Sequence, residues 1–283
     1  MVYFYCGVPG SGKSLHLAKT ICEDWLFHGK NVICINISLK EEEILKLARS
    51  RGIDNVGTLV CVPGHELLKN AFTYPGQKKN ARADERPDKY SYIEGLYGFA
   101  ENFHKYNDKF QYEEGQTLVA ISECEDFFDN RAWNKSDRIS WVEFFRMHRH
   151  YGFDCILESQ TDKGIDKKIQ AILQTKVEHR DYINYKGFWK MFAVLRGGHA
   201  FLCVETLYAL KNNKLNHLKS YFNNNYEAYY DIYDSFATTQ HIKGKVFLTE
   251  EQKEKARRDK IWAECVYELL NGAYVACPEP ARG

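Results

Sequence analysis

The chain has 283 residues, 44% of them apolar, and a formal net charge of +1 at pH 7. This length and composition suit one large α/β domain with an appendage, or two small domains with ordinary cores. The near-neutral charge excludes a strongly basic nucleic-acid sleeve over the whole surface, and no apolar run reaches the roughly eighteen residues of a membrane span.

Apolar strands alternate with helices along the first part of the chain. Strands are predicted at 2–6, 31–37, 58–62, 117–121 and 153–158, and helices near 13–28, 40–51, 138–150 and 165–173. Near-continuous apolar strands separated by helices indicate an α/β fold, with a mostly parallel sheet covered by helices on both faces. The nine cysteines form no Cys-x-x-Cys pair, and several lie in apolar runs, which predicts reduced, buried thiols in a cytoplasm.

Three segments depart from this alternation. Residues 70–116 form a long aromatic and charged insertion. From 176 onward, strands around the glycines at 187 and 197–198 indicate an antiparallel ribbon at the sheet edge. The tail from 245 has the pattern of an amphipathic helix. We therefore predict one main α/β domain over 1–210, which includes the insertion, and a C-terminal helical extension over 211–283.

A glycine-rich motif follows the first predicted strand and precedes the first helix. It reads G-x-x-x-x-G-K-S and comprises Gly7, Val8, Pro9, Gly10, Ser11, Gly12, Lys13 and Ser14. The backbone N–H groups of such a turn bind phosphate, the lysine reaches the outer phosphates, and the serine hydroxyl holds Mg²⁺. The motif predicts a site for ATP and Mg²⁺; its alternative is a glycine-rich turn without a ligand.

Hydrolysis also requires acidic groups at the end of a second buried strand. The run 117–121 is followed by Ser122 and Glu123, where an Asp for Mg²⁺ and a carboxylate for the attacking water are expected. Glu123 suits the second role, and its alternative is a solvated acid at a strand end. Ser122 stands where the Asp is expected; its hydroxyl can bind a water on Mg²⁺ but supplies no charge.

Further polar residues are candidates for the same site. Gln160 follows the strand 153–158 and either orients water and senses phosphate release or caps the next helix. The candidates for an arginine finger, from the same or a neighbouring subunit, are Arg146, Arg149 and Arg180, and each has a surface ion pair as its alternative.

Two clusters have a favoured simple explanation. His148-Arg149-His150 lacks an acidic or cysteine partner at ligand spacing, so histidines on a helix surface or subunit contact are favoured over a metal site. The insertion interleaves basic residues with tyrosines, as single-strand-binding loops do, but acidic residues nearly cancel the charge and favour a solvated loop. The basic residues and tyrosines are Lys78, Lys79, Arg82, Arg86, Lys89, Tyr74, Tyr90 and Tyr92.

Several of these blocks together resemble one family. The order of 7–14, Ser122-Glu123-Cys124, the M-H-R-H-Y-G-F-D block at 147–154 and the neighbourhood of 230–233 is similar to that of the zonula occludens toxin-like (Zot) family. This family includes the gene I assembly ATPases of filamentous phages, within the FtsK/HerA branch of P-loop motors. Ser159-Gln160 also resembles the T-Q strand end of FtsK/HerA motors.

The resemblance implies a RecA-like ATPase core in a homo-oligomeric ring, which drives phage assembly and export at the host inner membrane. It assigns nucleotide and Mg²⁺ to Lys13 and Ser14, water activation to Glu123 and phosphate sensing to Gln160. The family's D-E-C is S-E-C here, so the resemblance leaves the hydrolysis rate open.

Coat or assembly proteins, and single-stranded DNA, are the partners expected from this reading. We expect a cytoplasmic protein that contacts the membrane through a partner or its C-terminal helix. A DNA-packaging translocase and a nucleotide-binding assembly switch with little hydrolysis remain alternatives, and for the switch Ser122→Asp should raise turnover sharply.

Overall fold

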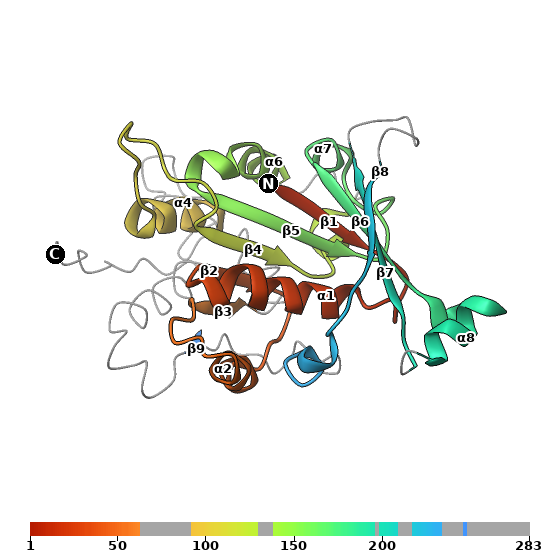
Figure 1. Ribbon diagram of the computed structural model, residues 1–283. Helices are drawn as coiled ribbons and strands as arrows, with labels where there is room; N and C mark the ends of the chain where they lie inside the picture. Colours follow the sequence, from red (N-terminus) through yellow and green to blue (C-terminus); the bar gives the residue numbers. More distant parts are fainter. Residues whose placement is uncertain (63–91, 130–137, 196–197, 209–216, 234–245, 248–283) are drawn as a thin grey trace, which may run out of the picture.

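The structure is a computed structural model that describes residues 1–62, 92–129, 138–195, 198–208, 217–233 and 246–247. Within these ranges, nine strands form one sheet in the order β8-β7-β6-β1-β5-β4-β2-β3-β9 (Figure 1). The parallel strands are β1 (Val2–Cys6), β2 (Asn31–Ile35), β3 (Leu59–Val62), β4 (Thr117–Ile121), β5 (Phe153–Ser159) and β6 (Thr175–Asp181). Antiparallel strands close both edges: β7 (Phe201–Leu207), β8 (His217–Phe222) and β9 (Val246–Phe247).

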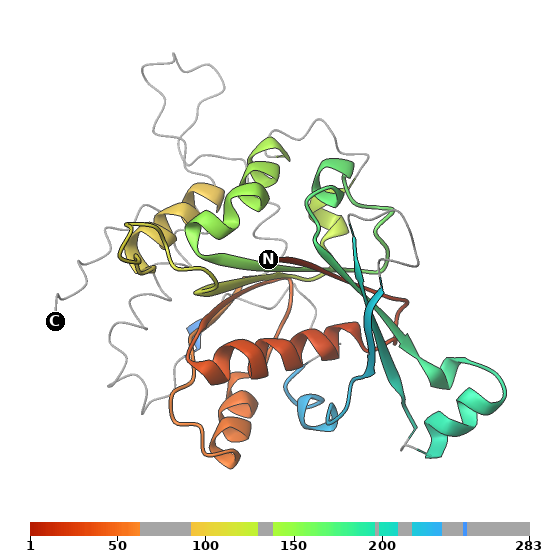
Figure 2. The same cartoon turned by 45° about the horizontal axis from the view of Figure 1, so that its top comes forward.

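Helices cover both faces of the sheet. α1 (Lys13–Thr20) continues through a π-helical turn and a 3₁₀ turn to Gly29, which ends it in a left-handed conformation. α1 and α2 (Glu41–Ser50) lie on one face, as Figures 1 and 2 show. The opposite face carries α4 (Tyr92–Phe103), α6 (Arg138–Met147) and α7 (Lys167–Gln170), and the short helix α5 (Glu125–Phe128) follows β4.

The core is divided by the sheet into two apolar layers, because successive strand residues point to opposite faces. One layer packs α1 and α2 residues such as Leu17 and Ile44 against Cys34, Ala120 and Ile156. The other layer packs residues of α4, α6 and α7 against the strands, among them Phe99, Trp141, Phe145, Ile169, Phe4, Val119 and Leu157. A parallel sheet needs this cover, because its strands are apolar on both faces.

The strand order brings three strand ends together. β5 lies between β1 and β4, with Cys6 opposite Ser159 and Ile121 opposite Leu157. The segments that follow these parallel strands therefore leave the sheet at the same side, where the carboxyl ends of the strands lie and where ligands of such folds bind.

Most predicted elements are confirmed. The five predicted strands and four predicted helices all occur. Trp141, Val142 and Phe145 of α6 are buried, and so is His148 in the turn that follows, which was expected on a helix surface or at a subunit contact. The antiparallel ribbon at the sheet edge also occurs: β7 pairs antiparallel with β6 on one side and with β8 on the other. The α/β class with a mostly parallel sheet is therefore confirmed.

One predicted strand is wrong. The segment between the two glycine positions forms a helix, α8 (Phe188–Leu195), instead of pairing with its neighbours. The ladder between β6 and β7 ends where Tyr182 N–H donates to Ala200 O, and the chain leaves the sheet between these residues. Short apolar runs fit helix and strand equally well, so the pattern alone could not separate them.

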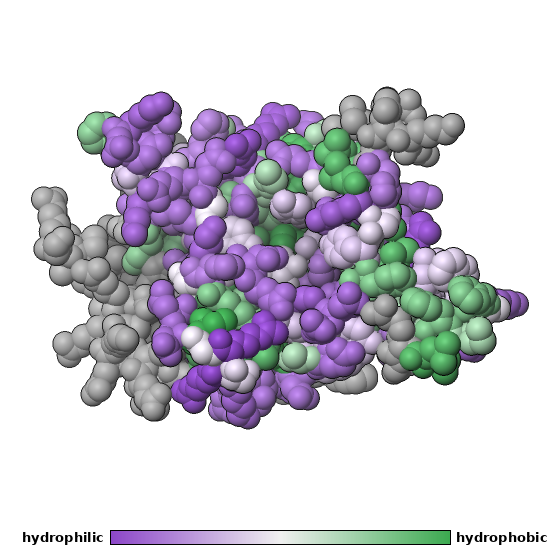
Figure 3. Space-filling view, in the orientation of Figure 1, coloured by the Kyte–Doolittle hydropathy of each residue, from purple (hydrophilic) through white to green (hydrophobic). Residues whose placement is uncertain are grey.

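α8 carries an exposed apolar surface, visible over this helix in Figure 3. Among its residues, Phe188 is 65% and Leu195 78% exposed, whereas Ala193 is buried. No helix in the described ranges is both long and apolar enough to cross a membrane.

Parts of the insertion and of the predicted extension belong to the same layers. The second half of the insertion forms α4, whose Leu96 and Phe99 are buried in the core. Beyond 210, β8 pairs with β7, and Tyr229 and Ile232 pack beside α1. The boundary near 210 stays a prediction, and the tail helix and the basic residues of the insertion lie outside the described residues.

Candidate nucleotide site

The glycine-rich motif forms the turn between β1 and α1. Gly10 and Gly12 adopt left-handed backbone conformations, with φ of 76° and 83°. Gly7 N–H donates to Gln160 O at 3.3 Å, so the start of the loop is tied to the end of β5. The loop thus brings its backbone to the N-terminus of α1, where the helix dipole favours an anion.

Two glycines of the loop, Gly7 and Gly12, have no room for a side chain. A Cβ at Gly12 would lie 2.6 Å from the Phe201 ring, and one at Gly7 would lie 2.6 Å from His179 O. Ser11 Oγ is buried and has no hydrogen-bond partner among the described residues. A closely packed turn with an unsatisfied hydroxyl fits a loop whose ligand is a phosphate.

The Lys13 and Ser14 side chains converge on a carboxylate from another strand. Ser14 Oγ donates to Glu158 Oε1 at 2.5 Å, and Lys13 Nζ lies 3.7 Å from the same oxygen. Ser122 Oγ, at the end of β4, donates to Glu158 Oε2 at 3.1 Å. The structure therefore brings Lys13, Ser14 and Ser122 together around Glu158.

Glu158 is the functional residue that the sequence prediction missed. Its side chain is fully buried in β5, and burial raises the pKa of its carboxyl, whereas the Ser14 hydrogen bond and the Lys13 charge act in the opposite direction. The available signal was an acid within the apolar strand Phe153–Ser159, since buried acids are rare without a partner. These oxygens are hard ligands of the kind that Mg²⁺ prefers, so the residues present fit that ion.

Glu123 lies at the same strand end in a strained conformation. Its φ is 48°, the left-handed region that side chains other than glycine seldom adopt. The side chain is half-buried, and burial raises the pKa of its carboxyl, with the Lys13 charge lowering it and Glu158 raising it further. A raised pKa makes a carboxylate a better proton acceptor.

Gln160 and Arg180 line one pocket beside the loop. This pocket has a volume of about 620 Å³ and is bounded by the ends of β1, β5 and β6. The Arg180 guanidinium pairs with Glu178 at 2.7 Å and is partly exposed. Both predicted residues are therefore next to Gly7, on the β6 side of the loop.

Arg149 lies elsewhere. It belongs to the 3₁₀ turn His148–Tyr151 that precedes β5, and its guanidinium makes a bidentate ion pair with Glu114 at 2.8 and 2.9 Å. The length of β5 separates it from Glu158 by roughly 20 Å, at about 3.3 Å per residue. Within one subunit, Arg149 does not reach the loop.

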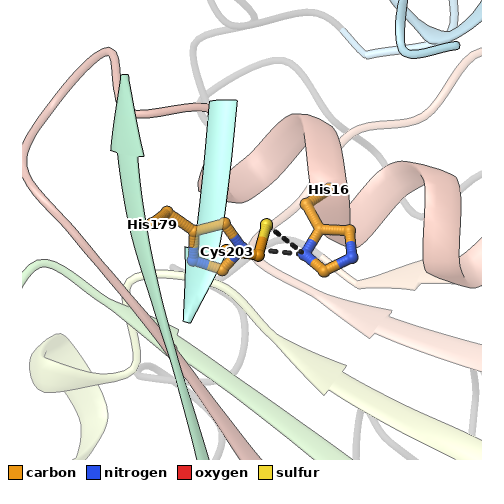
Figure 4. Close-up of side chains that lie close together, drawn as sticks. All are labelled: His16, His179 and Cys203. Atoms are coloured by element: carbon orange, nitrogen blue, oxygen red, sulfur yellow. Dashed lines mark hydrogen bonds between the residues drawn. The ribbon is translucent and has the colours of Figure 1, made fainter. Parts of the chain in front are cut away.

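A buried histidine pair, His16 on α1 and His179 on β6, lies next to Cys203 (Figure 4). His179 Nδ1 lies 3.1 Å from Cys6 O, which makes Nδ1 the protonated nitrogen and leaves Nε2 to accept from His16 Nδ1 at 2.8 Å. Burial lowers the pKa of both rings, that of His179 to about 4, so both are neutral near pH 7.

Cys203 completes a group of three possible metal ligands with this pair. The two ring nitrogens already satisfy each other, so the group needs no ion. Its described contacts connect α1, β6 and the residue before Gly7, and this connection fixes the position of the loop.

The loop, the helix that follows it and the adjoining strand ends define the class: this is a P-loop nucleotide-binding protein. The sequence profile described as zonular occludens toxin (Zot) matches residues 1–218. The chain therefore belongs to the Zot family. No curated protein sequence matches it.

Solved structures with a similar arrangement include that of the N-terminal domain of zonular occludens toxin from Neisseria meningitidis. It is 15% identical with a TM-score of 0.45, and the match covers 82% of this chain and 98% of that one. Another is the genome packaging NTPase B204 from Sulfolobus turreted icosahedral virus 2 in complex with ATP-gammaS, at 12% identity and a TM-score of 0.37. That match covers 78% of this chain and 95% of the other.

Proposed function

We propose that this chain is an ATP-driven motor that assembles and exports phage particles at the inner membrane of a host bacterium. The observation that carries the proposal is the convergence of Lys13, Ser14, Ser122, Glu158 and Glu123 at one edge of the parallel sheet, in a chain of the Zot family. A nucleotide switch without hydrolysis would need no proton acceptor in a strained backbone at this position.

Each residue of the site has a separate role in the proposed hydrolysis of ATP. The backbone N–H groups of 7–14 and the Lys13 ammonium bind the phosphates, and Ser14 with its neighbours holds Mg²⁺. The Mg²⁺ ion, when bound, neutralises phosphate charge. Glu123 accepts a proton from the attacking water. Gln160, tied through its carbonyl to Gly7 N–H, links loss of the terminal phosphate to movement at the end of β5.

The arginines take different roles in this proposal. Arg180 lines the pocket of its own subunit and stabilises charge there once it leaves Glu178. Arg149 is exposed at the opposite edge of the sheet, so it acts only on the site of a neighbouring subunit. The proposed assembly is a homo-oligomeric ring in the host cytoplasm, with coat or assembly proteins as partners.

Nucleotide hydrolysis by the purified full-length chain tests the core of the proposal. Lys13→Ala should abolish ATP hydrolysis, and Lys19→Ala is the matched control, because Lys19 lies on the same helix and contacts Asn224 O instead of the loop. Hydrolysis by Lys13→Ala at the wild-type rate would contradict the proposal.

The nature of the stimulating partner separates export from genome packaging. Stimulation of the ATPase by coat protein or membrane vesicles, and not by DNA, is the result that export predicts. Stimulation by single- or double-stranded DNA alone would replace export with a DNA-packaging translocase.

A further inference from the structure

The end of β4 lacks the acidic residue that usually assists a P-loop magnesium ion. Ser122 stands there, and a hydroxyl supplies no charge to a divalent cation. A P-loop serine and a second hydroxyl alone would therefore bind Mg²⁺ weakly, and the charge has to come from another position.

The geometry of β5 supplies a carboxylate at this point. Strand residues alternate between faces, and Ile156 packs in the layer that contains α1, so Glu158 points to the same face. Both of its oxygens are engaged by the hydroxyls of Ser14 and Ser122, at 2.5 and 3.1 Å. One carboxylate thus contacts the serine of the P-loop and the serine that replaces the acid.

Packing alone does not account for Glu158. A buried carboxylate is unfavourable unless it is paired, and an apolar side chain would suit the interior of β5 better. Its cationic partner is Lys13, whose ammonium is needed by the phosphates once ATP binds. The carboxylate is then left with a negative charge beside Ser14.

From this arrangement we infer that Glu158 takes the part of the missing acid: it provides, from the neighbouring strand, the negative charge that holds Mg²⁺ at Ser14. The inference rests on the proposed function, because it assumes that the P-loop binds ATP. On this inference Ser122 does not weaken the site, because its hydroxyl donates a hydrogen bond that orients the Glu158 carboxylate.

Metal affinity tests this assignment without reference to turnover. Mn²⁺ binding to the full chain with a non-hydrolysable ATP analogue is titrated by electron paramagnetic resonance, and analogue binding is measured separately in EDTA. Glu158→Gln should weaken Mn²⁺ binding at least tenfold and leave analogue affinity in EDTA unchanged or tighter, since it releases Lys13. Glu205→Gln is the control: it removes a β7 carboxylate that accepts a hydrogen bond from Tyr221 on β8, and it should bind Mn²⁺ as the wild type does.

A second variant places the carboxylate on β4 instead of on β5. Ser122→Asp combined with Glu158→Leu should restore Mn²⁺ affinity to within about threefold of the wild type, and it keeps the test informative if Glu158→Gln does not fold. Wild-type Mn²⁺ affinity in Glu158→Gln, or no recovery in the folded double variant, would overturn the inference. Absence of analogue binding by the wild-type chain in EDTA and in Mn²⁺ would overturn the proposed function itself, and this inference with it.

Discussion

The left-handed conformation of Glu123 is unfavourable for folding, and it occurs at a residue that we propose for catalysis. A non-glycine residue with φ of 48° costs about 1 kcal/mol, and such residues concentrate at functional sites. The sequence predicted the position of Glu123 from its place after β4, but no sequence pattern indicated its conformation.

Glu123→Gly should therefore stabilise the fold and destroy activity. We expect the free energy of unfolding in urea to rise by about 1 kcal/mol, and ATP hydrolysis to fall at least about a hundredfold because the proposed proton acceptor is lost. Phe110→Gly is the control: its φ is 56°, its side chain is 89% exposed, and it should show the stabilisation without the loss. Equal loss of hydrolysis in both variants would remove Glu123 from the chemistry.

The contact between Gly12 and Phe201 makes a second residue-scale prediction. Gly12→Ala should lower the free energy of unfolding by roughly 2–4 kcal/mol, because the new methyl group meets the ring and φ stays positive. In a Phe201→Ala background, the same change should cost only about 1–2 kcal/mol, since only the backbone strain remains. Urea denaturation of the four proteins measures the difference, and a cost independent of Phe201 would refute the steric explanation.

At the residue scale, the motif spacing indicated where several candidate residues lie, and their chemical roles stay predictions. The loop 7–14, Glu123 and Gln160 all lie at the predicted edge of the sheet. Glu158 was missed because its role depends on β5 lying between β1 and β4, and strand order is not written in the local pattern. Arg149 also lies in a family-like motif, yet it precedes β5 instead of following it, so it lies at the amino end of that strand, away from the loop.

At the scale of elements, periodicity predicted the parallel strands and α6, but not α8. Buried elements are held by the sheet or by a helix face, so their patterns are strong. α8 leaves the sheet, and most of its apolar side chains are exposed, so neither a core face nor a strand partner constrained the prediction.

The exposure of α8 leads to a prediction about stability. Leu195→Ser should change the free energy of unfolding by less than about 0.5 kcal/mol, because its side chain is 78% exposed. Leu17→Ala in the buried layer beside α1 should cost about 2–5 kcal/mol in the same urea titration. A large loss for Leu195→Ser would mean that α8 is covered in the folded protein.

At the scale of the whole molecule, buried histidines determine how the fold responds to acid. Burial lowers the pKa of His104, His148 and His179 to about 4, and that of His16 well below its usual value. A histidine whose pKa is lower in the folded state stays neutral there while the unfolded chain takes up a proton. Its stabilising contribution is complete above about pH 6.5 and is lost as the pH falls toward 4.

The free energy of unfolding should consequently fall steeply between pH 6.5 and 4.5. Each of the three histidines with a folded pKa near 4 should account for about 2 kcal/mol at pH 5 relative to neutral pH. Thermal unfolding across this range measures how the free energy of unfolding changes with pH. His104→Asn should reduce this dependence, because one proton fewer is taken up on unfolding. A midpoint that is constant from pH 7 to 5 would show that these rings are protonated in the folded protein.

The seven cysteines in the described part of the chain are all buried, and two of them adjoin the nucleotide site. Cys6 precedes Gly7, Cys124 follows Glu123, and burial raises the pKa of both thiols, that of Cys6 to about 12. Because alkylating reagents need an accessible thiolate, these side chains react only when the strand ends open. Mass spectrometry of alkylated peptides, with and without ATP, therefore measures the exposure of each strand end separately.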